Sequence, residues 1–162
     1  DYMYLQQMRF GQRIKYMCDV DKECMDELVP AFVLQPLIEN AIIHGLSSSS
    51  KGGLIYVRCF KKENKMWLSV ADTGIGIERD KLKNIRRYID NIFLSPDTKP
   101  AATAENDNKS DADNGIKRKT VGVGIGNIAY RIKGMYNNSG IKIYSVKDRG
   151  TVIQIFFDNY SK

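Results

Sequence analysis

A long polar segment, residues 95–120, places the tightest limit on how this chain can fold. The segment is rich in Ala, Asn, Asp and Lys and holds almost no large apolar residue. Such a stretch cannot bury enough apolar surface to offset the conformational entropy that ordering would cost. A loop of this length inside a compact domain is uncommon unless it is a lid or a linker. The sequence therefore predicts one domain of 162 residues whose core comes from both sides of a mobile loop.

Apolar periodicity outside this segment predicts an α+β fold. Alternation of apolar and polar residues indicates strands at 12–20, 54–60, 66–71, 141–146 and 151–157. Helical spacing of apolar residues indicates helices at 1–10, 29–46 and 78–94, and a further helix that starts in the glycine cluster 122–126. Pro30 and Pro36 predict irregular first turns for the second helix. Short connections between strands, with helices gathered on one face, predict a two-layer α/β sandwich with a mixed, mainly antiparallel sheet.

Charge and composition argue against several classes of function. The net charge is +6, and residues 95–120 contribute none of it because their acidic and basic side chains are equal in number. The excess fits either an ordinary solvated surface or a polyanion partner, such as the phosphates of a nucleotide. No dense Lys/Arg stripe with interleaved aromatic residues occurs, so nucleic acid is not an expected partner. One histidine and no C-x-x-C pair argue against a Cys/His zinc site.

The helix predicted at 29–46 carries three polar residues that could do chemistry. Asn40 is a poor helix-interior residue, because its amide competes with the backbone for hydrogen bonds. Asn40 and His44 are four residues apart and share a helix face, and Glu39 lies beside them. An amide oxygen, a carboxylate and an imidazole could together coordinate a hard cation and contact phosphates. The alternative interpretation of Asn40 is a satisfied polar residue at the edge of the core.

A first glycine cluster follows the strand predicted at 66–71. Asp72 ends that strand and precedes Gly74 and Gly76. The carboxylate could accept hydrogen bonds from a ligand amine, and the glycines would let the backbone approach the ligand closely. A plain turn has the same composition, because Asp and Gly are among the commonest turn residues.

A second glycine cluster opens the helix that follows the polar segment. Gly122, Gly124 and Asn127 lie where a helix begins, and the free N–H groups of a helix start suit phosphate. The sixth position of this motif is Asn127 instead of glycine, so it is not the dinucleotide-binding fingerprint. No P-loop motif occurs anywhere in the chain.

Taken in order, these motifs resemble those of a known family. The run VLQPLIENAIIHG at 33–45 resembles the N box of sensor histidine kinases of the LytS/YesM type. DTGIGI at 72–77 is similar to their first glycine box, and GVGIGN at 122–127 to their second. Gly150-Thr151 resembles the glycine–threonine pair before their last strand.

The resemblance implies a division of the chain and a fold. Residues 1–10 are similar to the end of a preceding helical segment for dimerisation and phosphoacceptance, and residues 11–162 to the catalytic domain, with a flexible lid at 95–120. The fold implied is the ATP-binding fold shared with gyrase B, the ninety-kilodalton heat-shock chaperone and mismatch-repair ATPases.

The resemblance also implies a role for each motif in binding ATP and Mg²⁺. Asn40 would ligand the Mg²⁺ that bridges the phosphates, and His44 would face phosphate or ribose. Asp72 would accept a hydrogen bond from the adenine amino group, with Thr151 close by through water. Gly74 and Gly76 would shape the adenine end of the site. Gly122, Gly124 and Asn127 would hold the lid hinge and the phosphates.

Departures from the family's pattern bear on the reaction. The family often carries Lys where this chain has Ile43, so one phosphate contact is expected either to be absent or to be supplied by Lys117, Arg118 or Lys119. Pro36 stands where gyrase-type relatives place a glutamate that activates water, which favours phosphotransfer over hydrolysis, although Glu39 could substitute as the base. His44 is the only histidine and belongs to the nucleotide-binding helix, so the phosphoacceptor histidine is expected upstream.

Partners and location follow from the same resemblance. The missing initiator Met suggests a piece of a longer protein. The expected partners are ATP, the upstream phosphoacceptor helices in a homodimer, and a response regulator. The expected location is a cytoplasmic domain of a protein anchored in a bacterial membrane. The alternatives are a related ATPase, an anti-sigma-type serine kinase, and a non-catalytic module gated by ATP.

Overall fold

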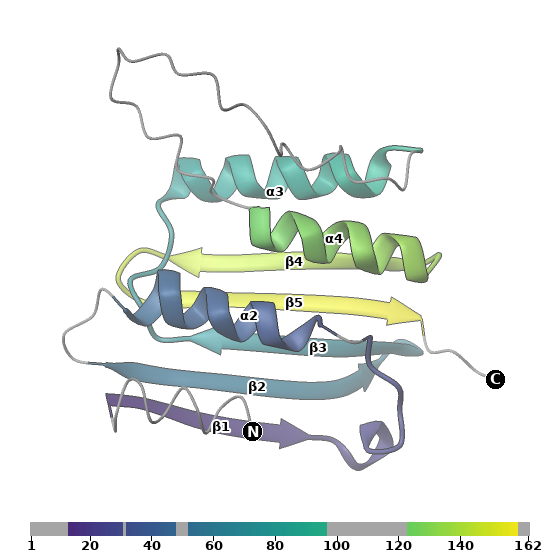
Figure 1. Ribbon diagram of the computed structural model, residues 1–162, viewed down its shortest axis with the longest axis horizontal. Coiled ribbons are helices and arrows are strands. Elements are labelled where there is room, and N and C mark those ends of the chain that lie inside the picture. Colours follow the sequence, from purple (N-terminus) through teal and green to yellow (C-terminus); the bar gives the residue numbers. More distant parts are fainter. Residues whose placement is uncertain (1–12, 31, 48–51, 97–122, 159–162) are drawn as a thin grey trace.

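Five strands form the central sheet of the protein (Figure 1). A computed structural model describes residues 13–30, 32–47, 52–96 and 123–158. The strands are β1 (Ile14–Val20), β2 (Gly53–Lys62), β3 (Lys65–Asp72), β4 (Ser139–Val146) and β5 (Gly150–Asp158), arranged in the order β1-β2-β3-β5-β4. β1 pairs with β2 in parallel, whereas the pairs β2–β3, β3–β5 and β4–β5 are antiparallel. The predicted mixed, mainly antiparallel sheet is confirmed.

In the part of the chain that the structure describes, three α-helices cover one face of this sheet (Figure 1). They are α2 (Leu34–Asn40), α3 (Arg79–Leu94) and α4 (Val123–Met135), and a short 3₁₀ helix, η2 (Lys22–Cys24), follows β1. α3 buries Leu82, Ile85, Ile89 and Ile92, which recur at helical spacing and form its inward stripe. The arrangement confirms the predicted α+β fold with two layers.

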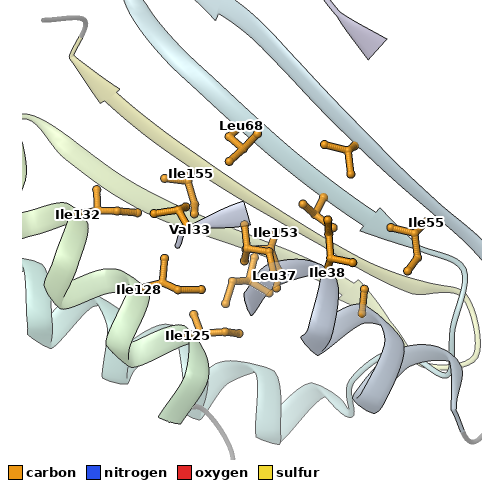
Figure 2. Packing of buried hydrophobic residues seen from close by; sticks show 14 of the residues in the cluster. Val33, Leu37, Ile38, Ile55, Leu68, Ile125, Ile128, Ile132, Ile153 and Ile155 are labelled. Atoms are coloured by element: carbon orange, nitrogen blue, oxygen red, sulfur yellow. The ribbon is translucent and has the colours of Figure 1, made fainter. Parts of the chain in front are cut away.

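The core lies between the helices and the sheet. Figure 2 shows side chains of α2 and α4 pointing toward the strands from one side. Leu37 of α2, Ile132 of α4 and Ile155 of β5 are fully buried there. Full burial of one such side chain contributes about 1.5–3 kcal/mol to the free energy of folding. The core therefore draws on both sides of the polar segment 95–120, as predicted.

The helix predicted at 29–46 begins later than expected and changes form. α2 starts at Leu34, which makes Pro36 its third residue. The N–H groups of a first helical turn have no partner within the helix, so a proline there costs no hydrogen bond. From Ala41 to Leu46 the chain continues as a π-helix, η3. The apolar periodicity did not predict this wider turn.

The hairpin between β2 and β3 has a shorter turn than the strands predicted at 54–60 and 66–71 would leave between them. The two strands run as far as Lys62 and Lys65, so only Glu63 and Asn64 remain in the turn. Both turn residues have positive φ, 53° and 58°, which is the geometry of a type I′ turn. This turn matches the right-handed twist of the strands that it joins.

Two predicted elements fall wholly or mostly outside the described residues. These are the helix at 1–10 and the loop at 95–120. The first loop residue, Ser95, donates its backbone N–H to the Asn91 carbonyl at 3.0 Å and ends α3. Among the helices of the described part, none is long and apolar enough to cross a membrane.

Candidate nucleotide-binding site

Four separate segments of the chain meet at one end of the sheet. β3 ends at Asp72, and the register of β5 places Thr151 opposite it. A β-carbon built on Gly45 would lie 2.7 Å from Asp72 Oδ1, and one built on Gly124 would lie 3.3 Å from Asn40 Oδ1. Figure 1 shows this end at the left of the view, where β3 ends and β5 and α4 begin. Folding thus brings together motifs that are far apart in sequence.

Asp72 is held by the turn that follows it. Its Oδ1 accepts a hydrogen bond from the Gly74 N–H at 2.8 Å. Burial raises the pKa of the Asp72 carboxyl above its ordinary value, while backbone hydrogen bonds from Gly74 and Thr151 partly oppose that rise. A carboxylate has about four lone-pair positions, so these bonds leave capacity for a further donor. The arrangement suits the predicted contact with a ligand amine.

The two glycines after Asp72 are required by the protein's own backbone. A β-carbon on Gly74 would lie 2.1 Å from the carbonyl oxygen of Gly45. One on Gly76 would lie 2.1 Å from the carbonyl oxygen of Val146, and Gly76 also has a φ of 64°. Sequence reasoning assigned these glycines to close approach by a ligand. The structure supplies a reason that holds without a ligand, because the turn packs directly against two neighbouring segments.

A hydroxyl network joins the Asp72 turn to the edge of the sheet. Ser145 Oγ accepts the Ile77 N–H at 2.8 Å and lies 2.9 Å from the hydroxyl of Thr151. Thr151 is buried, so its hydroxyl needs such a partner. Sequence reasoning singled out Thr151 but missed Ser145. A single serine in an exposed-edge strand is too common a feature to mark a site.

Asn40, the last residue of α2, carries a half-buried side-chain amide. Its Nδ2 is buried and has no hydrogen-bond partner among the described residues. Buried polar atoms in folded proteins are nearly always paired, and an orphan in a candidate site indicates a missing partner. Its Oδ1 lies near Gly124 at the start of α4. The first and last of the three motifs therefore lie beside each other in the fold.

The side-chain oxygen of Asn40 at this end of the sheet suits a magnesium ion that binds together with a nucleotide. Within the described ranges, no group of three or more His, Cys, Asp or Glu side chains is placed to hold a metal ion. Mg²⁺ usually takes one or two ligands from the protein and the rest from water and phosphates. Asn40 offers one hard oxygen beside the start of α4, which is enough for that mode of binding.

The neighbours of Asn40 differ in their surroundings. Glu39 is half-buried and accepts a hydrogen bond from Gln35 Nε2 at 3.0 Å, one turn earlier on α2. His44 is exposed and belongs to the π-helical segment η3. The Glu39 carboxylate is therefore held along α2, whereas the His44 side chain is exposed to solvent.

The start of α4 supplies the second glycine motif. Gly124 and Asn127 are exposed in its first turns, while Gly122 lies outside the described residues. The first backbone N–H groups of a helix have no partner within it and carry the positive end of the helix dipole. Because Gly124 adjoins Asn40, these groups face the same region as the orphaned amide.

Comparison with known families agrees with this geometry. The model of the histidine kinase-, DNA gyrase B-, and HSP90-like ATPase family matches residues 25–161. The chain belongs to this family. The resemblance inferred from its motifs is confirmed, as is ATP as the expected ligand.

Individual relatives are named as sensor proteins, one of them as a sensor histidine kinase. The chain is 32% identical over 85 residues to the sensor histidine kinase YpdA of Escherichia coli strain K12, which covers 52% of this chain and 15% of YpdA. It is 33% identical over 108 residues to the sensor protein LytS of Staphylococcus haemolyticus, which covers 67% of this chain and 18% of LytS. The catalytic domain of the histidine kinase ThkA shares the fold, with a TM-score of 0.57 at 14% identity over 97% of this chain and 86% of that one.

The chain spans less than a fifth of the length of YpdA or of LytS. The similarity therefore concerns one part of those proteins. It supports a domain assignment directly and an activity of the longer protein only by inference.

Proposed function

We propose that this chain is the catalytic, ATP-binding domain of a two-component sensor histidine kinase. The single observation that carries the proposal is the meeting of Asn40, Asp72 and the start of α4 at one end of the sheet. These are a hard oxygen ligand, an acceptor for an amine and a helix start suited to phosphate. Membership in an ATPase family and similarity to proteins named as sensor histidine kinases support it.

The proposed reaction depends on position and electrostatics. Phosphoryl transfer needs alignment of the reacting groups and neutralisation of charge more than covalent help from the protein. Asp72 would select the base and fix one end of ATP, and the N–H groups at the start of α4 would receive the phosphates. Asn40 would hold Mg²⁺, which when bound neutralises phosphate charge. His44 at the rim would contact phosphate or ribose.

The phosphoacceptor is proposed to lie in another segment of the longer protein. His44 is the only histidine of this chain and is part of the proposed nucleotide site. The proposed partners are therefore the upstream phosphoacceptor helices, paired in a homodimer, and a response regulator that receives the phosphate from them. We place the domain in the cytoplasm and the longer protein at the bacterial membrane.

The proposal predicts that the isolated chain binds ATP without labelling itself. Incubated with Mg²⁺ and γ-labelled ATP, the 162-residue chain should stay unlabelled. Addition of the upstream segment should produce an acid-labile phosphohistidine on that segment, slowly, because proximity is lost when the parts are separate. Label on His44 itself, or no label on the upstream segment in the presence of a chain that binds ATP, would contradict the proposal.

Hydrolysis of ATP by water is the second candidate function. It is favoured by the position of Glu39, a half-buried carboxylate directly before Asn40 that Gln35 holds in place. If Glu39 is a general base, Glu39→Gln should lower phosphate release by about 10²-fold or more and leave ATP affinity unchanged. The matched control is Glu63→Gln, at the exposed turn between β2 and β3. Equal phosphate release by the Glu39 variant and the unaltered chain would leave phosphotransfer as the function.

A further inference from the structure

Gly45 lies against the carboxylate that is proposed to select the base. It is buried in η3, the π-helical segment Ala41–Leu46. A β-carbon on Gly45 would lie 2.7 Å from Asp72 Oδ1 and 2.9 Å from Asp72 Cγ. Carbon atoms in folded proteins essentially never approach so closely, so any side chain here would displace the carboxylate. Because Gly45 has only a hydrogen in place of a side chain, the Asp72 carboxylate has room to lie against it.

The backbone of Gly45 also holds the turn after Asp72. Its carbonyl oxygen accepts the Ile75 N–H at 3.0 Å. The same oxygen would lie 2.1 Å from a β-carbon on Gly74, so those two glycines are in direct backbone contact. Gly74 in turn donates its N–H to Asp72 Oδ1 at 2.8 Å. Gly45 therefore positions the carboxylate from one side and the turn that binds it from the other.

The π-helical form of η3 explains how a helix residue comes to do this. In this segment the Ser47 N–H donates to the Ile42 carbonyl, five residues earlier, at 2.8 Å. The wider turn shifts which residues face inward, and single π turns are frequent at functional sites. Here Gly45 is buried against the end of β3, while His44 beside it is exposed.

We propose that Gly45 is a specificity-determining positioning residue. Base selection would depend on the absence of a side chain at Gly45, because only then does the Asp72 carboxylate keep the place in which it accepts the ligand amine. Gly45 acts through Asp72 and is not itself proposed to touch the base. The inference rests on the proposed function and deepens it, since it assigns a determinant of adenine recognition outside the first glycine box.

Gly45→Ala separates this role from backbone effects. Gly45 does not have a positive φ, and alanine is the better helix former, so the backbone tolerates the change. The methyl group should move the carboxylate, and displacement of a positioned group by about 1 Å can cost up to ~10²-fold. We expect ATP affinity to fall about tenfold or more, and the preference for ATP over GTP to fall with it. Gly134→Ala on α4 is the matched control, because no atom lies within 4 Å of its β-carbon position.

The experiment is a double-mutant cycle read by calorimetric titration with Mg-ATP and Mg-GTP. Asp72→Ala removes the carboxylate carbon and oxygens that the new methyl group would meet. In that background Gly45→Ala should cost no further ATP affinity and no thermal stability, whereas independent effects would add. A further supporting result is that Gly45→Ala alone fails to fold while the double variant folds. That recovery would show that the new methyl group and the Asp72 carboxylate compete for one space, and it would support the inference.

The possible outcomes separate the inference from the proposed function. An unaltered chain that binds no adenine nucleotide would overturn the proposed function. An unaltered chain that binds ATP, with a Gly45→Ala variant that keeps both its affinity and its preference for ATP over GTP, would overturn the inference alone. Equal losses for ATP and GTP, or a loss of stability that persists with Asp72→Ala, would indicate a general packing role for Gly45 and would also overturn it.

Discussion

Asn40→Ala should slow phosphotransfer in the longer protein by about 100-fold or more, the cost expected when one preorganised electrostatic contact to a reacting group is removed. The reason is the loss of the Asn40 amide oxygen, which lies beside the start of α4 and is proposed to bind Mg²⁺. The measurement is the rate of phosphohistidine formation at saturating Mg-ATP.

The stability of the Asn40→Ala domain should not fall along with its activity. Asn40 Nδ2 is buried without a partner among the described residues, so its removal relieves a desolvation cost. The thermal midpoint of Asn40→Ala should therefore equal or exceed that of the unaltered domain. Asn84→Ala, exposed on α3, is the matched control for both measurements. An Asn40→Ala domain that unfolds would support a structural amide at the core edge and contradict the proposed role.

Asp72→Asn should weaken ATP binding by about 10- to 100-fold, the usual cost of losing a hydrogen bond to a charged acceptor. The asparagine keeps the size of the side chain and an oxygen for the Gly74 N–H, so the turn should remain formed. The charge that accepts the ligand amine is lost, and the preference for ATP over GTP should be lost with it. Titration with both nucleotides gives the result.

Asp72→Asn also tests how the buried charge of Asp72 affects the stability of the folded domain. Burial raises the pKa of this carboxyl in the folded state above its value in the unfolded chain. The folded state therefore holds the proton of Asp72 more tightly than the unfolded chain does. The stability gained in this way is fully present below the unfolded pKa and is lost as pH rises through the folded pKa. Asp72→Asn should therefore be more stable than the unaltered domain at neutral pH, and the difference should shrink toward acid pH. A variant that is less stable at pH 7 would contradict this account.

Much of the fold could be predicted from the sequence because its elements have strong local patterns. The strand predicted at 151–157 is β5 (Gly150–Asp158), and the helix predicted at 78–94 is α3 (Arg79–Leu94), each within one residue at either end. Both have unbroken periodicity and clear boundaries. The helix predicted to begin at residue 29 begins five residues later, at Leu34. The apolar residues before Leu34 continue a helical spacing that the backbone does not follow.

The candidate site could be predicted where its residues stand in recognisable motifs. Asn40 and Asp72 belong to the runs 33–45 and 72–77, whose order along the chain resembles that of a known family, although each residue alone also fits a plain structural role. Gly45 lies near the end of the helix predicted at 29–46 and had no assigned role, because its contact with Asp72 exists only after η3 packs against β3. Ser145 gave no signal for the same reason, as its partners come from the turn after β3 and from β5.

The central claim is that ATP binds at the end of the sheet where Asn40, Asp72 and the start of α4 meet. A crystal structure of the domain with Mg²⁺ and a non-hydrolysable ATP analogue tests it most directly. The account predicts the adenine amino nitrogen within about 2.7–3.2 Å of an Asp72 carboxylate oxygen, and Asn40 Oδ1 at about 2.0–2.1 Å from Mg²⁺. A nucleotide bound elsewhere on the domain, or a metal ion at the phosphates without Asn40 among its ligands, would contradict it.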